Sequence, residues 1–87
     1  MSGESLSTKD HDTIRTWAEE RGGKPVRVKD TGVIELDFPG YSGGDRFEEI
    51  SWDEWFEVFD ERDLELQYQE TTKDGERSNF NRLTDGS

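Results

Sequence analysis

The chain has 87 residues, with 22 acidic against 11 basic side chains and a formal net charge of −11. This length suits one domain with a modest core, and the absence of cysteine excludes a disulfide framework, a thiolate zinc site and a thiol nucleophile. The negative charge repels nucleic acids and anionic membranes. No stretch approaches the roughly 18 apolar residues of a membrane span, and residues 1–9 lack a signal-peptide pattern, so we expect a soluble cytoplasmic protein.

Three interpretations of the acidity stay open at this point. The acidic surface is simply solvated, it is an adaptation to a high-salt environment, or it imitates a nucleic acid and occupies a DNA- or RNA-binding partner. The small number of lysines, four in all, agrees with the high-salt interpretation. Only 28% of the chain is hydrophobic, but the aromatic residues are large and lie in periodic segments, which predicts a folded centre.

The first predicted element is a helix over residues 11–22, preceded by a flexible tail at residues 1–9. The acidic residues around His11 offer an N-cap and favour the positive end of a helix. Apolar side chains with helical spacing follow at Ile14, Trp17 and Ala18. The two glycines at 22 and 23 predict its end.

Alternating apolar and polar residues then predict a hairpin over residues 25–38. Its first strand contains Val26 and Val28, and its second strand alternates through Ile34, Leu36 and Phe38. The glycine-rich segment 39–45 predicts a loop. It lacks the lysine and the following helix start that a phosphate-binding loop requires.

The second predicted helix begins after Ser51, which forms a capping-box pattern with Glu54. Four aromatic residues then share one helical face: Trp52, Trp55, Phe56 and Phe59. Such spacing indicates a core face rather than a surface that stacks sugars or bases.

Two further strands complete the predicted domain. Leu64, Leu66 and Tyr68 alternate with polar residues, a turn follows at 73–75, and a shorter strand lies around 80–83, before a flexible tail at 84–87. The order α-β-β-α-β-β over residues 10–83 predicts a single α+β domain. We expect an antiparallel four-stranded sheet with two helices on one face.

Several strings of the sequence carry a resemblance when they are taken together. They are DHDTIR at 10–15, WAEERGGKP at 17–25, DFPG at 37–40, ISWDEWF at 50–56 and YQE at 68–70. In this combination the chain resembles a family of short uncharacterised prokaryotic proteins, some of which carry the name alpha-glucan branching enzyme. The resemblance covers residues 10–83 and implies a shared small fold. Glucan branching requires a large barrel with a carboxylate nucleophile and an acid partner, so the resemblance supplies no catalytic residues.

The sequence predicts no catalytic residues, no metal site and no cofactor. His11 is the only histidine and is expected to be a solvated residue of the first helical turn. Serine-hydrolase and zinc-hydrolase motifs are absent, and the acidic run 60–65 lacks the glycine of a calcium loop. We therefore expect a non-enzymatic interaction module, a monomer or weak dimer, that binds an unknown protein partner and no membrane. A small enzyme of unrecognised type is the more distant alternative.

One basic patch runs against the overall charge and is defined by Arg21, Lys24, Arg27 and Lys29, with Arg15 as a further contributor. Cations complement a helix C-terminus, and exposed strand positions are often charged, so this patch has an ordinary structural interpretation. The functional alternative is a site for a nucleic acid or another polyanion. These five residues are the candidate binding residues of the sequence.

Overall fold

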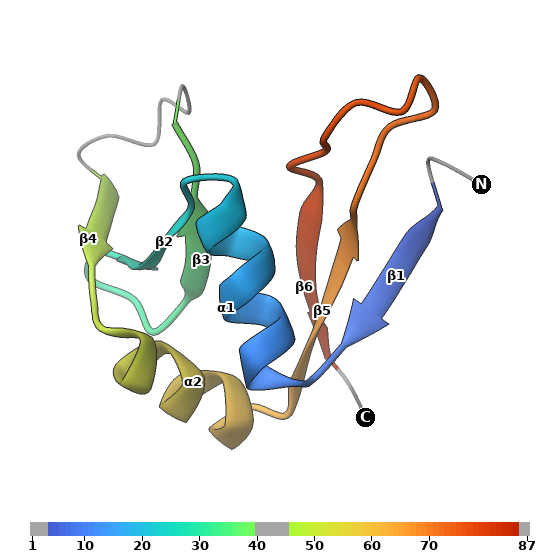
Figure 1. The fold of residues 1–87 in the computed structure, drawn as a ribbon. Coiled ribbons are helices and arrows are strands. Elements are labelled where there is room, and N and C mark those ends of the chain that lie inside the picture. The colour runs from blue at the N-terminus through green and yellow to red at the C-terminus, as the bar shows by residue number, and fades with distance from the viewer. Residues whose placement is uncertain (1–3, 40–45, 86–87) are drawn as a thin grey trace.

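The computed structural model describes residues 4–39 and 46–85, which form two helices and six strands (Figure 1). In chain order the elements are β1 (Ser5–Thr8), α1 (His11–Glu20), β2 (Lys24–Val28), β3 (Ile34–Asp37), β4 (Phe47–Glu49), α2 (Trp52–Glu61), β5 (Leu64–Gln69) and β6 (Asn81–Asp85). The α+β class predicted from the sequence is confirmed. Most of the predicted glycine-rich loop, residues 40–45, lies outside the described residues.

Helix α1 begins at its predicted start and ends slightly earlier than predicted. The Asp10 carboxylate accepts a hydrogen bond of 2.9 Å from the Thr13 N–H, which caps the first turn. At the other end Gly22 adopts a φ of +72°, and the N–H of Gly23 donates to the carbonyl of Ala18. This left-handed glycine cap ends the helix at Glu20 instead of residue 22.

Helix α2 follows the aromatic pattern of its sequence. The Ser51 hydroxyl accepts a hydrogen bond of 3.1 Å from the Glu54 N–H, which confirms the predicted N-cap. Trp55, Phe56 and Phe59 are buried and their rings pack against one another, while Trp52 is half-buried at the edge of the cluster. The aromatic face is therefore core, as its spacing predicts.

The prediction of one four-stranded sheet is wrong, because the strands form two separate three-stranded antiparallel sheets. One sheet has the order β3-β2-β4 and the other has the order β1-β5-β6. Both predicted hairpins are present, β2 with β3 and β5 with β6. Each hairpin is widened by a strand that was not predicted, β4 beside β2 and β1 beside β5, and the two hairpins do not pair with each other.

The missed strands are β1 and β4, and their own sequences carry little strand signal. Residues 5–8 were assigned to a flexible tail, but Leu6 pairs with Tyr68 and the segment extends the β5 ladder. β4 is only three residues long and contains two glutamates. β6 likewise continues to Asp85, into the predicted C-terminal tail. Backbone pairing with a stronger neighbouring strand, rather than apolar alternation, places these segments in the sheets.

The helices join the two sheets into one molecule. Figure 1 shows α1 in front of the space between the sheets, and α2 below the β3-β2-β4 sheet, from where the chain leads into β5. Helix α2 contacts β2 and β3 of one sheet and β5 of the other. One buried cluster contains side chains from both helices and both sheets: Ile14, Trp17, Ala18, Ile34, Leu36, Phe38, Trp55, Phe56, Phe59, Leu66 and Tyr68. The helices therefore do not cover one face of a single sheet.

His11 lies in the first turn of α1 and keeps part of its side chain in solvent, as predicted, but it also connects the two helices. Its ring stacks on Phe56 with 4.1 Å between the centroids, and its Nε2 lies 2.8 Å from Oδ1 of Asp60. The side chain is consequently half-buried. Its neighbours in space belong to α2, which a local pattern at residues 10–12 does not show.

The cap at Asp10 predicts a specific pH dependence of stability. Hydrogen bonds from the Thr13 hydroxyl and then from its N–H lower the pKa of Asp10. A carboxyl group whose pKa is lowered on folding stabilises the fold at neutral pH, and this contribution is lost as the pH falls through the lowered value. The difference in thermal midpoint between the unmodified chain and Asp10→Ala should be largest at neutral pH and shrink below about pH 4. Asp10→Asn, which caps without titrating, is the control, and a constant difference down to strongly acidic pH would contradict the assignment.

Candidate functional site

The structure places the five predicted binding residues in different surroundings. Arg21 is turned inward, and only 4% of its side chain is exposed. Arg15 lies on the exposed surface of α1, with its guanidinium 3.8 Å from Asp12. The first two of these residues thus differ in burial, since the Arg21 side chain is buried and the Arg15 side chain is exposed.

Lys24 and Arg27, the two basic-patch residues in β2, both lie close to carboxylates of this chain. Sheet register places Glu48 of β4 opposite Arg27, and the two side chains form an ion pair. Glu54 in the first turn of α2 adds a second carboxylate 3.8 Å from the same guanidinium. Lys24 lies 4.0 Å from Glu49. An anion that binds here has to compete with these three carboxylates.

Lys29 is the member of the basic patch that differs from this pattern. It is exposed, and no carboxylate of the described residues forms an ion pair with it. Its backbone N–H donates to the carbonyl of Arg46. A single lysine provides far less charge than the cluster of cations that a nucleic-acid backbone requires.

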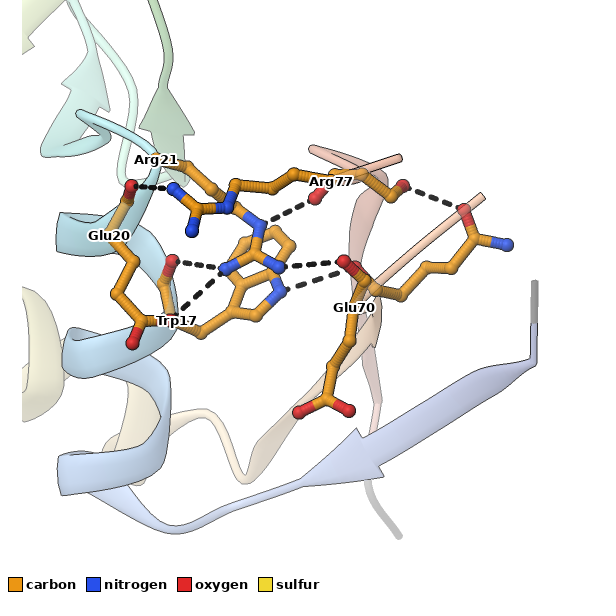
Figure 2. A network of polar contacts seen from close by, with 7 residues as sticks. Trp17, Glu20, Arg21, Glu70 and Arg77 are labelled. Carbon is orange, nitrogen blue, oxygen red and sulfur yellow. Dashed lines mark hydrogen bonds and ion pairs between the residues drawn. The ribbon is translucent and has the colours of Figure 1, made fainter. Parts of the chain in front are cut away.

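Arg21 forms the centre of a polar network that ties α1 to the connection between β5 and β6. Figure 2 shows its guanidinium between the end of α1 and the chain near Glu70. It donates to the carbonyls of Ser78, Trp17 and Glu70, the last two at 2.9 Å. The guanidinium also lies over the Trp17 ring, 4.6 Å from its centroid. Burial lowers the pKa of Arg21, and the neighbouring Arg77 contributes to the same shift.

Further contacts strengthen this network. Arg77 donates to the backbone carbonyl of Glu20 at 2.8 Å, and the Trp17 indole N–H donates to the carbonyl of Gln69 at 3.2 Å. At the end of α1, side chains thereby satisfy the carbonyls of Trp17 and Glu20, while those of Ala18 and Glu19 accept from backbone N–H groups of residues 21–23. Arg21 is consequently a structural residue, and its guanidinium is not available to an anion from solvent.

Beside this network lies a hollow of about 360 Å³ between α1 and β5, which we call the acidic cleft. Its lining residues are Asp12, Thr13, Thr16, Trp17, Glu20, Tyr68 and Glu70. The α1 residues come from successive turns of one helix face, and the other two come from the end of β5 and the residue after it. The Arg21 network fixes the distance between these two walls, because it joins the end of α1 to Glu70.

Three carboxylates line the acidic cleft together with two aromatic side chains, and the Arg15 guanidinium lies 3.8 Å from one of them, that of Asp12. Glu20 has the Arg21 guanidinium 3.5 Å away, but that group is held mainly by backbone carbonyls. Figure 2 shows the Glu70 carboxylate pointing away from Arg21, and no described cation forms an ion pair with it. Burial raises the pKa of Tyr68, and the Glu70 charge raises it further, so the phenol is neutral. The cleft therefore combines negative charge with aromatic surface and hydroxyl groups.

Sequence reasoning missed the acidic cleft, although part of its signal was present. Asp12, Thr16 and Glu20 recur every four residues, which places three polar side chains in a row on one helix face. Trp17 was correctly assigned to the core, but its position as the floor of a cleft depends on β5. Tyr68 and Glu70 come from a distant part of the chain, and only the pairing of the sheets brings them to α1.

Within residues 4–39 and 46–85, no group of three or more histidine, cysteine, aspartate or glutamate side chains is arranged to hold a metal ion. No helix in those two ranges is long and apolar enough to cross a bilayer. Comparisons with protein-family models, curated proteins and solved structures find no match to this chain. The family resemblance of the sequence consequently stays a prediction.

Proposed function

We propose that this protein is a non-enzymatic binding module, and that its partner is a protein segment that presents basic side chains to the acidic cleft. The observation that carries this proposal is the arrangement of Asp12, Glu20 and Glu70 around Trp17 and Tyr68. Carboxylates attract a cationic side chain, and aromatic surface accommodates its alkyl stem and its charge. The proposal therefore names a partner opposite in charge to the one suggested by the basic patch.

The charge of the whole molecule supports a cationic partner. A net charge of −11 produces a field that draws positively charged molecules and raises their rate of association. The acidic cleft adds local carboxylates to this field, and no described cation forms an ion pair with the Glu70 carboxylate. Long-range attraction and the local site consequently favour the same class of partner.

Polyanion binding through the basic patch is the weaker proposal. Arg21 donates to three backbone carbonyls, and Arg27 and Lys24 lie beside glutamates of β4 and α2. A phosphate group at this surface would have to displace those glutamates against the net charge of the molecule. The chain thus offers a better site for cations than for anions.

The experiment compares two double variants that remove the same charge from different places. Glu20→Gln with Glu70→Gln neutralises the acidic cleft and leaves the backbone carbonyls of both residues in the Arg21 network. Glu57→Gln with Glu61→Gln neutralises two exposed positions on α2 outside the cleft. A short peptide of alternating lysine and serine, titrated by calorimetry at moderate salt, serves as the probe.

We expect the cleft variant to bind the peptide roughly tenfold more weakly, because each lost exposed ion pair contributes up to about 1 kcal/mol. The α2 variant should lose less than threefold in affinity, because it changes only the net charge of the molecule and leaves the cleft intact. Thermal unfolding of both variants checks that they remain folded. Equal weakening in the two variants would contradict the proposal, since binding would then depend on total charge and not on the cleft.

A further inference from the structure

The two sheets face each other across a hollow that is bounded by strand edges. β3 ends one sheet and β6 ends the other, and Figure 1 shows these two strands as neighbours, with α1 in front of the space between them. Among the described residues, no backbone hydrogen bond joins the two edges. A hollow of about 300 Å³ lies between them and is lined by Val33, Ile34, Glu35, Asn81, Arg82 and Leu83.

The backbone of β3 directs hydrogen-bonding groups toward this hollow. The Val28 N–H donates to the Val33 carbonyl at 2.9 Å. Bonded and non-bonded residue pairs alternate along an antiparallel ladder, so the next pair, Arg27 with Ile34, is not bonded. The N–H and the carbonyl of Ile34 consequently point away from β2, to the side on which β6 lies.

These outward groups of Ile34 lack both a protein partner and ready access to water. Only 3% of Ile34 is exposed, and no described residue forms a hydrogen bond with the outer side of its backbone. Buried backbone N–H and carbonyl groups nearly always have a partner. An unpaired strand edge is also a template for pairing with another chain. The edge of β3 therefore indicates a missing strand.

The side chains beside the hollow define what such a strand would contact. Ile34 belongs to the buried core cluster and Leu83 packs against it, whereas Glu35 and Arg82 are exposed. Neither of these two charged side chains forms an ion pair with a described residue. Because successive side chains of a strand point to opposite faces, every second residue of an added strand meets the apolar side chains, and the others lie beside the charged ones.

We propose that the hollow between β3 and β6 receives an extended segment of a partner protein, which pairs with both edges and joins the two sheets into one. A single extended chain can pair with both edges at once, because its N–H and carbonyl groups point to both sides. The segment alternates apolar with basic residues, since Glu35 and the net charge of −11 favour cations on the outer face. This surface is separate from the acidic cleft, and the inference does not depend on the proposed function.

The test is an amide NMR titration of the labelled protein, at moderate salt, with a hexapeptide of alternating valine and lysine. The peptide should shift residues 33–37 and 81–85 and should protect the Ile34 N–H from hydrogen exchange. The control peptide carries N-methyl groups on alternate residues, which removes the N–H donors of one edge and keeps the side chains and the charge. It should bind roughly tenfold more weakly or worse.

A charge reversal beside the hollow provides a matched pair of protein variants. Glu35→Lys places a lysine where the peptide presents its own lysines, so the affinity should fall roughly tenfold. Glu57→Lys makes the same change at an exposed position of α2 and should weaken binding less than threefold. Both positions are exposed, and thermal unfolding checks that both variants remain folded.

Three results would overturn this inference. Nuclear Overhauser contacts between backbone amides of β3 and β6 in the free protein would show that the two edges pair directly and leave no place for a strand. Equal binding of the N-methylated peptide would show that backbone pairing is not involved. If the valine–lysine peptide shifts only residues 12–20 and 68–70, the strand site is wrong, while the proposed function at the acidic cleft survives and is tested separately by the lysine–serine peptide.

Discussion

Replacing Trp55 with alanine is expected to remove most of the stability of the fold. Trp55 is fully buried, its ring stacks on Phe59 with 5.3 Å between the centroids, and its indole N–H donates to the Glu35 carbonyl at 2.9 Å. Truncating such a side chain costs about 3–5 kcal/mol. A domain of this size has a total stability of about 4–13 kcal/mol, so the variant should be largely unfolded or melt roughly 15–30 °C lower.

Trp52 provides a matched control for this prediction, because it belongs to the same helix and the same aromatic cluster but is only half-buried. Trp52→Ala should lower the thermal midpoint by less than half as much as Trp55→Ala. Thermal unfolding followed by circular dichroism measures both. A folded Trp55→Ala variant with an unchanged midpoint would show that the aromatic face of α2 is not the core.

Arg21→Ala is expected to cause the second large loss of stability. This substitution leaves the carbonyls of Ser78, Trp17 and Glu70 without their charged donor and removes the cation over the Trp17 ring. Hydrogen bonds to charged groups contribute about 1.5–3 kcal/mol, and some of the freed carbonyls regain water. We therefore expect the free energy of unfolding to fall by about 3 kcal/mol. The contact between the end of α1 and residues 70–78 should weaken first.

The control is Lys24→Ala, which removes a cation of the same basic patch from an exposed position. Its only described ion pair, with Glu49, has a separation of 4.0 Å, so the change in stability should stay within about 0.5 kcal/mol. Chemical denaturation of both variants measures the difference. If both variants lose equally little stability, Arg21 has no structural role and is again a candidate for anion binding.

Local sequence patterns predicted the helices and the two hairpins correctly, because each of these elements contains its own signal. Ser51 and Asp10 are caps that act within one turn, and the Trp55–Phe59 face follows from helical spacing alone. The strands β1 and β4 could not be predicted in the same way. Their pairing depends on β5 and β2, and these partners lie tens of residues away from them along the chain.

The candidate site shows more clearly that local sequence patterns do not predict which side chains meet in space. Arg21 and Arg27 are close in sequence and share a charge, but the glycine cap at Gly22 turns the chain between them, and Arg21 faces the interior while Arg27 meets Glu48. Cations that are adjacent in sequence therefore do not form one surface. The acidic cleft shows the reverse case. Tyr68 and Glu70 are far from α1 in the sequence, and the fold brings them next to it.

The most direct test of a cationic partner at the acidic cleft is a pair of amide NMR titrations of the labelled protein at moderate salt. One uses the lysine–serine peptide and the other uses a short DNA duplex. Our account predicts that the peptide shifts residues 12–20 and 68–70, and that the duplex leaves residues 24–29 unperturbed. Salt-sensitive shifts at 24–29 with the duplex, together with no shifts at the cleft with the peptide, would contradict it.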